Sequence, residues 1–297
     1  MGGQCRAWRG STASQPLKAP TPGAALWQGR ILGMDLRLDA LAALCLRSPA
    51  DKLAATAQLW TRAVDEPVAG LDTLAVIEAR PDLPGRPDLP RLVDPRQVPQ
   101  RSVHTREGRA ALIHAIAHIE FNAINLALDA VWRYPGMPRA YYLDWLRVAA
   151  EEAGHHAMLV RHLASLGHVY GDFDAHDGLW GMCVKTADDV LARMALVPRT
   201  LEARGLDATP LIQSKLQQVG DLEAVAILDV LLRDEVGHVA VGNHWYHWLC
   251  RERGLEPLAH YRFLSRQHQA PRPRGPFNFE ARARAGFSAA ELDDLQT

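Results

Sequence analysis

A five-residue phrase, acid-Glu-x-Gly-His, occurs twice in the sequence, at residues 151–155 and again at residues 234–238. On a helix, a Glu and a His three positions apart lie on one face about a turn apart, where both side chains can reach a single metal ion. Each phrase is centred in an apolar stripe with helical spacing, and a helix buries such a stripe. Because an ionised carboxylate is very costly to bury without a partner, two such sites in one chain call for a compensating cation.

Two more glutamates occupy the same kind of position, since apolar residues flank Glu120 and Glu202 at helical spacing. The single Glu precedes the Glu-x-x-His by 32 residues in the first pair (120 to 152) and by 33 in the second (202 to 235), which suggests a duplicated helix pair. This is the ligand set of carboxylate-bridged di-iron and di-manganese bundles. The predicted metal ligands are Glu120, Glu152, His155, Glu202, Glu235 and His238.

The ligand types indicate which metals the site would take. Four carboxylates neutralise the four positive charges of two divalent ions, and mixed carboxylate and imidazole ligands suit iron or manganese. The absence of nearby thiolates argues against structural zinc, so two transition-metal ions are expected, with iron favoured over manganese. Each ligand histidine is expected to place its second ring nitrogen on a carboxylate or a carbonyl.

Three side chains are expected near the ligands without being first choices to bind the metal. His162 follows His155 by seven residues and faces the same way, whereas His156 is an alternative to His155 as a ligand. Arg204 is the third side chain expected near the ligands. In a different interpretation there is no metal, and the inward glutamates form buried ion pairs with arginines, although such pairs often contribute little stability. The arginines available for that role are Arg147, Arg193, Arg199 and Arg204.

Helical periodicity and an almost complete lack of strand signals predict an all-α fold. Pro198 should kink the third long helix or begin a new turn there. Glycine follows each of the last three long patterns, as expected of a C-terminal stop. Two N-terminal helices are predicted at 35–47 and 50–65, four long helices at 106–133, 138–166, 179–204 and 221–253, and short ones at 210–219 and 288–292.

The regions between and around these helices define the predicted organisation. Residues 1–33 carry no acid and many Gly, Ser, Pro and Ala, which predicts either a disordered extension or an over-long gene start with Met34 as the true one. An organelle transit peptide is the alternative. Residues 34–78 are expected to hold N-terminal helices that pack on a four-helix body at 105–254. The intervening 79–104 is a proline-rich linker or wrap, because a regular helix or strand does not survive that proline density. Residues 255–297 form a C-terminal extension.

Other polar residues are interpreted as structural. His114 and His118 project about 160–200° away from Glu120 on a helical wheel, so polar positions at the helix edge are expected. Glu223 is expected to be a solvated charge near a helix start. His244 and His247 are expected to be packing or surface residues. The segment 170–180 is either a lid over the site or a packed crossover.

Composition limits the class of protein. The chain has 297 residues and a formal net charge of −1, so its charge does not favour nucleic acid or an anionic membrane as a partner. No uninterrupted apolar run approaches the roughly 18 residues that span a bilayer. The cysteines, Cys5, Cys45, Cys183 and Cys250, are scattered singly and do not suggest a disulfide framework. A reducing cytoplasm is therefore the expected location.

At the residues that carry the chemistry, the chain resembles the ferritin-like superfamily, and within it the uncharacterised bacterial domain-of-unknown-function family 455. The resemblance covers about residues 35–295 and implies an up-down four-helix bundle with a long crossover at 167–178. It also implies ligation by the same six residues, with Pro198 as a departure just before Glu202. The family carries no established reaction. The matching phrases are HAIAHIE at 114–120, the two acid-Glu-x-Gly-His phrases, and LEARGLD at 201–207.

These features lead to a first expectation of function and two alternatives. The first is an oxidoreductase in which two reduced irons react with dioxygen and a small-molecule substrate is oxidised or hydroxylated, with substrate and electron donor unassigned. Similar superfamily members modify tRNA, but this chain lacks the overall basic charge of a tRNA binder, although a local patch would permit one. The alternatives are a metal-binding protein for iron handling or peroxide scavenging, and a structural bundle. A homodimer is compatible with each.

Overall fold

The computed structural model describes residues 35–65 and 70–296, which belong to one compact unit. The predicted disordered extension, 1–33, lies outside the described residues. The described part is helical and contains no β-strand, which confirms the all-α prediction. Its only β-type pairing is an isolated parallel bridge between Leu92 and Ala175.

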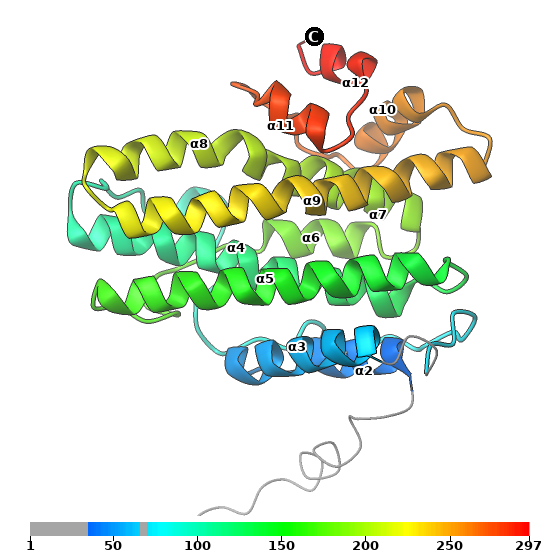
Figure 1. Cartoon of the computed structure of the whole chain (residues 1–297), viewed down its shortest axis with the longest axis horizontal. Coiled ribbons are helices and arrows are strands. Elements are labelled where there is room, and N and C mark those ends of the chain that lie inside the picture. Colours follow the sequence, from blue (N-terminus) through cyan, green and yellow to red (C-terminus); the bar gives the residue numbers. More distant parts are fainter. Residues whose placement is uncertain (1–34, 66–69, 297) are drawn as a thin grey trace, which may run out of the picture. The chain divides into compact units, whose positions relative to one another are not determined.

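Three of the four long helices match their predicted ranges closely. They are α4 (Arg106–Arg133), α5 (Arg139–Ser165) and α9 (Leu222–Glu252). Thr105 caps α4 by accepting a hydrogen bond from the Gly108 amide, which satisfies one of the free N–H groups of the first turn. Helix α5 packs against both α4 and α9, and α9 packs against α8 (Ala203–Gln218), as Figure 1 shows.

The third predicted helix, 179–204, is wrong as a continuous element. The chain instead forms α6 (Gly178–Lys185), α7 (Val190–Leu196) and a π-helical segment (Val197–Glu202) that leads into α8. The helix is interrupted between α6 and α7, at residues 186–189. Farther along, Pro198 lacks an N–H and cannot continue the α-helical ladder, and the chain is π-helical there. The predicted stop at Gly205 and the separate helix at 210–219 are also wrong, since α8 runs through both to Gln218.

The close approach of α9 to the π-helical segment depends on a glycine. A Cβ added to Gly242 of α9 would lie 2.5 Å from Cβ and 2.6 Å from Cγ of Pro198. These distances are shorter than any ordinary contact between carbon atoms. Gly242 therefore allows the proline, and the segment that ends in Glu202, to lie directly against α9.

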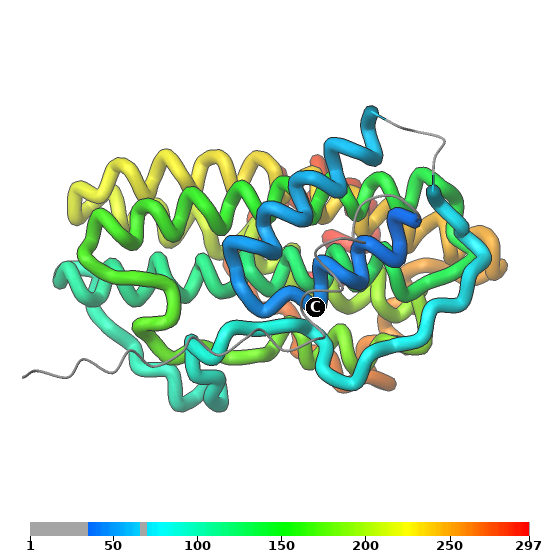
Figure 2. Tube along the Cα trace, turned by 90° about the horizontal axis from the view of Figure 1, so that it is seen from below, coloured from blue at the N-terminus to red at the C-terminus, as the bar shows by residue number. Residues whose placement is uncertain are grey.

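The N-terminal helices, α2 (Leu36–Leu44) and α3 (Pro49–Asp65), lie against α4 and α5. Buried cations tie them to their surroundings: Arg37 donates to the Trp132 carbonyl of α4, and Lys52 donates to the Gly85 carbonyl and to Asn125 of α4. The following proline-rich chain runs as an extended strap past the helices, seen as the cyan tube in Figure 2. Its regular structure within the described residues is one 3-10 turn, Pro95–Gln97.

The C-terminal extension contains three helices, α10 (Pro257–Gln267), α11 (Phe279–Arg284) and α12 (Ala289–Asp294). Only the last of them was predicted. Helices α10 and α11 contact α9, and α11 also contacts α8 (Figure 1). A small apolar core lies between the C-terminal extension and the helices α8 and α9. In it, Ala281, Ala285 and Phe287 pack among residues of α8 and α9.

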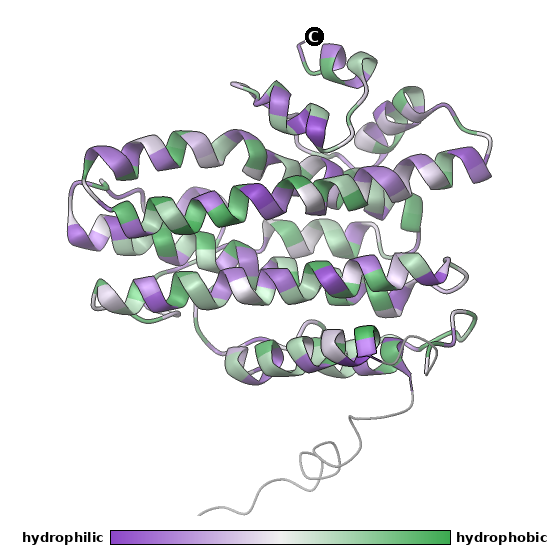
Figure 3. Cartoon of the chain, in the orientation of Figure 1, coloured by the Kyte–Doolittle hydropathy of each residue, from purple (hydrophilic) through white to green (hydrophobic). Residues whose placement is uncertain are grey.

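Apolar and polar residues alternate along the long helices, and hydrophilic residues recur in the middle of α5 and α9 (Figure 3). By length and composition α4 could cross a membrane, although it contains no uninterrupted apolar run of that length. That property is weak support for a membrane span, because 78% of the apolar window is buried inside the structure, as in any core helix. The thiols of Cys45, Cys183 and Cys250 are free.

Candidate metal centre

Helices α4, α5 and α9 bring five of the six predicted ligands together. Glu120, Glu152 and His155 form one group, and Glu152, Glu235 and His238 form another. Within each group the potential ligand atoms all lie within 4.8 Å of one another. Glu152 belongs to both groups. Its carboxylate would therefore lie between two adjacent ion positions.

Both histidines direct Nδ1 to the glutamates. His155 Nδ1 lies 3.2 Å from Glu120 Oε2 and 3.2 Å from Glu152 Oε2. His238 Nδ1 lies 2.8 Å from Glu152 Oε1 and 3.8 Å from Glu235 Oε1, without the alignment of a hydrogen bond to Glu152. The two imidazole rings are 5.7 Å apart between centroids.

The sixth predicted ligand, Glu202, reaches the same neighbourhood from the π-helical segment. Its side chain is buried, and within the described residues neither carboxylate oxygen has a hydrogen-bond partner. Burial raises the pKa of Glu202 well above its ordinary value, and the charges of Glu235 and Glu152 raise it further. Glu202 thus adds a fourth carboxylate beside the second group, although it is not a member of either close group.

The second ring nitrogen of each histidine meets an acid from the opposite phrase. His155 of α5 has Nε2 3.2 Å from Asp234 Oδ2 of α9, and His238 of α9 has Nε2 2.8 Å from Glu151 Oε2 of α5. The first acid of each acid-Glu-x-Gly-His phrase therefore holds the histidine of the other phrase. We did not predict Glu151 and Asp234 as site residues, yet the repeated acid at the head of both phrases was the signal.

These contacts show that the donor set fits metal ions. A carboxylate oxygen only accepts hydrogen bonds, and both nitrogens of each histidine face carboxylates. If Nε2–H donates to the outer acid, the Nδ1 lone pair faces the glutamates and must meet a proton or a metal ion. Five buried atoms in the described cluster lack a hydrogen-bond partner: Glu152 Oε1, both oxygens of Glu202, Glu235 Oε2 and His238 Nδ1. Divalent cations bound by these atoms would satisfy them and offset the carboxylate charge.

Without a metal ion, the cluster must hold protons instead. Burial raises the pKa of Glu120, and the neighbouring Glu152 raises it further. Burial likewise raises the pKa of Glu235. Burial alone would lower the pKa of His155, but hydrogen bonds to Glu120 and Glu152 raise it to about 11. Since metal ligands must be deprotonated, a bound ion would displace these protons.

The interpretation in which arginines neutralise the inward glutamates does not agree with the structure. Arg193 pairs with Asp129 at 2.6 Å, and Arg199 pairs with Glu291 at 2.5 Å. Arg147 lies 3.6 Å from Glu151, which is an outer acid of the cluster. Arg204 is exposed on α8, and its exposure does not support the expectation that it lies near the ligands.

The two further histidines expected near the ligands, His162 and His156, have partners outside the cluster. His162 Nε2 is 3.0 Å from Asp221 Oδ1, and its Nδ1 is 3.3 Å from the largely exposed Glu223, both at the start of α9. His156 Nδ1 donates to the Ala117 carbonyl at 2.9 Å, which leaves His155 as the histidine that faces the glutamates.

The expectation that His114 and His118 lie at a polar helix edge is wrong, because both side chains are buried. Their rings stack on Tyr170 of the crossover, and a 2.8 Å hydrogen bond joins His118 Nδ1 to the Tyr170 hydroxyl. The ring of His156 also contacts Tyr170. The start of the crossover segment 170–180 is thus packed against α4 and α5, as expected of a packed connection.

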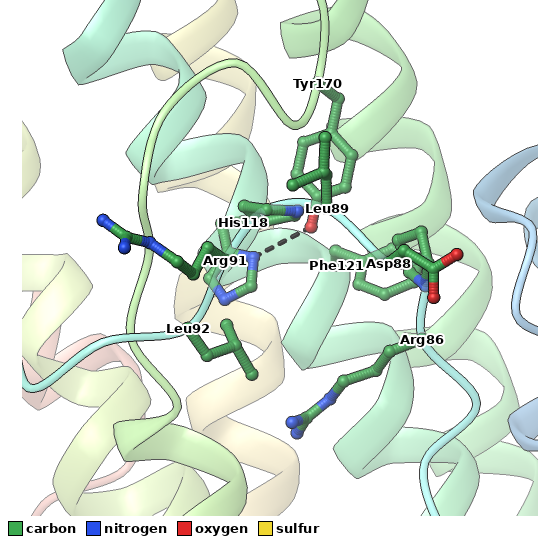
Figure 4. Close-up of a pocket in the computed structure, with 10 residues that line it drawn as sticks. Arg86, Asp88, Leu89, Arg91, Leu92, His118, Phe121 and Tyr170 are labelled. Atoms are coloured by element: carbon green, nitrogen blue, oxygen red, sulfur yellow. Dashed lines mark hydrogen bonds between the residues drawn. The ribbon is translucent and has the colours of Figure 1, made fainter.

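Beside this aromatic group lies a pocket of about 440 Å³ between the strap and α4. Figure 4 shows His118, Phe121 and Tyr170 on one side, with Arg86 and Leu92 across from them. None of the cluster residues lines the pocket. Phe121 follows Glu120 in α4, and at 3.6 residues per turn its side chain leaves the helix about 100° away from that glutamate. A molecule bound in the pocket would therefore face a different side of α4 from the cluster.

Comparison with known proteins gives a family but no activity. The sequence matches the family described as "Protein of unknown function (DUF455)" over residues 45–293, which include every cluster residue. A protein of Haemophilus influenzae described as "Uncharacterized protein" is 53% identical over 214 residues, 70% of this chain and 74% of that protein. No solved structure matches the chain.

Proposed function

The chain belongs to the DUF455 family of proteins of unknown function, and from this premise we propose that it is a ferritin-like protein that binds two transition-metal ions. One observation carries the proposal: buried glutamate and histidine atoms without hydrogen-bond partners surround Glu152, which is shared by two groups of ligand atoms. Glu120 and His155 would hold one ion, and Glu235 and His238 the other, with Glu202 beside the second. Iron is favoured over manganese on ligand type.

We propose further that the protein is an oxygen-activating oxidase or hydroxylase of a small molecule. The metal pair would supply redox chemistry with dioxygen. The protein's part is to hold the ligands and limit the access of water. Asp234 and Glu151 fix the orientation of His155 and His238, and burial keeps Glu120 and Glu152 from solvent. An external electron donor would be needed for repeated turnover.

The second candidate is a peroxide-scavenging or iron-handling protein. It is favoured by the position of the 440 Å³ pocket, whose lining contains no cluster residue. A bulky substrate bound in that pocket would be separated from the cluster by α4. A small oxidant such as peroxide needs no pocket of this size, and would react at the cluster itself.

Metal content by elemental mass spectrometry tests the shared proposal. We expect about two transition-metal ions per chain in protein loaded anaerobically with iron, because two ligand groups are present. Glu152→Gln should lose most of both ions, since Glu152 belongs to both groups. Glu223→Gln is the matched control, because Glu223 is a largely exposed glutamate of α9 and should keep both ions. Folded wild-type protein that remains empty after iron loading would contradict the proposal.

The consumption of oxidants separates the two candidates. Iron-loaded, reduced protein is mixed with dioxygen or with hydrogen peroxide, and the loss of each oxidant is followed. Preferential loss of dioxygen supports the oxidase, whereas rapid loss of peroxide with slow reaction of dioxygen supports the scavenger. The Glu152→Gln protein gives the background rate for both reactions.

A further inference from the structure

The C-terminal extension contacts the chain on both sides of Glu202. Before this glutamate, Arg199 pairs with Glu291 of α12, and Thr200 Oγ1 lies 3.0 Å from the Tyr261 hydroxyl of α10. After it, Arg282 of α11 donates two hydrogen bonds to Asp207, at 3.0 and 2.6 Å. The π-helical segment and the first turns of α8 are therefore held from outside by all three C-terminal helices.

Arg199 is the centre of these contacts. Its buried guanidinium donates to Asn243 of α9 at 2.7 Å and to Glu291 of α12 at 2.5 Å. Aromatic rings enclose the same group, with Tyr246 at 4.9 Å and Phe287 at 4.7 Å from their centroids. Paired hydrogen bonds and aromatic stacking suit the planar guanidinium and restrict its orientation. Arg199 is three residues before Glu202 in the same π-helical segment, so fixing one restricts the other.

The C-terminal extension packs next to the half of the cluster that contains Glu235, His238 and Glu202. Phe287, Ala281 and Ala285 share an apolar core with Val236 and Val239, the neighbours of Glu235 and His238 in α9. The same core includes Ala203, which follows Glu202. In contrast, Glu120 and His155 belong to α4 and α5, which form the largest helix contact of the described structure.

We propose that Arg199, held by Glu291 of the C-terminal helix α12, is a positioning residue that keeps Glu202 turned toward the second ion position. The C-terminal extension would then control the position formed by Glu235 and His238, and leave the position formed by Glu120 and His155 unaffected. This inference rests on the proposed metal site. It adds that the two ion positions depend on different parts of the chain.

Titration of the full chain with Mn²⁺, followed by calorimetry, tests the inference. Glu291→Gln removes the charge that orients Arg199, and should weaken binding at one of two positions by about 10- to 100-fold, as for groups that orient metal ligands. Binding at the other position should not change. Glu280→Gln is the matched control, since Glu280 is an exposed glutamate of α11, and should bind as the wild type does. Arg199→Lys, which keeps the charge without the guanidinium fork, should repeat the effect if Glu291→Gln does not fold.

Hydrogen exchange of metal-free protein supplies a readout that does not depend on ions. Amides of residues 197–206 should exchange at least about tenfold faster in Glu291→Gln than in Glu280→Gln, whereas those of α4 should be unchanged. Equal weakening of both ion positions, or unchanged Mn²⁺ binding in Glu291→Gln and Arg199→Lys, would overturn the positioning role. Wild-type protein that binds neither iron nor Mn²⁺ would instead overturn the proposed metal site.

Discussion

At the residue scale, the least expected feature is the exchange of acids between the two matched phrases. Glu151 lies beside His238, and Asp234 lies beside His155, so each phrase completes the other. Both acids are partly exposed, whereas the histidines that they hold are buried. Each acid therefore links a buried ring to the surface of the α5–α9 pair.

Neutralising these acids should affect the two ion positions separately. Glu151→Gln should weaken the position that contains His238, and Asp234→Asn the one that contains His155, each by about 10- to 100-fold. The reason is that an amide can turn its NH₂ group to Nε2 and so favour the tautomer with the proton on Nδ1. Competitive Mn²⁺ titration of the two variants checks this, with Glu223→Gln, at a largely exposed glutamate of α9, as a surface control. If both variants lost the same Mn²⁺ affinity at both ion positions, the two acids would act only through the total charge of the cluster.

At the scale of elements, the π-helical segment is the part of the fold that departs most from a regular bundle. Pro198 interrupts the helical ladder, and the segment places the buried Arg199 guanidinium among aromatic rings and Glu202 in the buried cluster. Single π-helical turns inside helices are frequent at functional sites. Here the turn is accommodated because α9 presents Gly242, and not a larger side chain, to the proline.

Gly242→Ala should displace this segment. The new Cβ would overlap Pro198, so a loss of stability of about 1–3 kcal/mol is expected from overpacking. Binding of one metal ion should weaken with it. Gly237→Ala is a suitable comparison in the same helix, because an added Cβ there would meet no atom within 4 Å, and alanine should stabilise the helix slightly. Chemical denaturation measures the first effect and metal content the second; equal stability of the two variants would disprove the close packing.

At the scale of the whole molecule, the C-terminal extension is an integral part of the structure. Burial alone would raise the pKa of Glu291, but the hydrogen bond from His247 and the charge of Arg199 lower it to about 2. A carboxyl with a lowered pKa in the folded state stabilises the fold above its ordinary pKa of 4.5. That stabilisation is lost as the pH falls from about 4.5 toward 2.

The pH dependence of unfolding should therefore differ between the wild type and Glu291→Gln. Between pH 6 and pH 3 the wild type should lose about 2 kcal/mol more stability than the variant, from the shift of one carboxyl pKa. Urea denaturation at the two pH values measures the difference, and the acids of the metal cluster contribute equally to both proteins. A difference of the same size in Glu280→Gln would show that the effect does not belong to the Glu291 carboxyl.

Most of the candidate site could be predicted from the sequence, because the period of a helix determines which residues share a face. Glu152 and His155 are three residues apart, as are Glu235 and His238, and the apolar stripes around them indicate burial. The all-α fold and the ranges of α4, α5 and α9 follow from the same periodicity and from their flanking turns. Whether these residues bind metal ions remains our proposal.

Tertiary structure decided how those faces meet. The pairing of Glu151 with His238, the buried ion pairs of Arg193 and Arg199, and the burial of His114 and His118 all depend on the rotation and separation of neighbouring helices. Local spacing carries no information about either quantity. The close approach of the π-helical segment to α9 and the packing of α10 to α12 behind Glu202 likewise depend on contacts between residues far apart in the chain, such as Pro198 with Gly242 and Arg199 with Glu291.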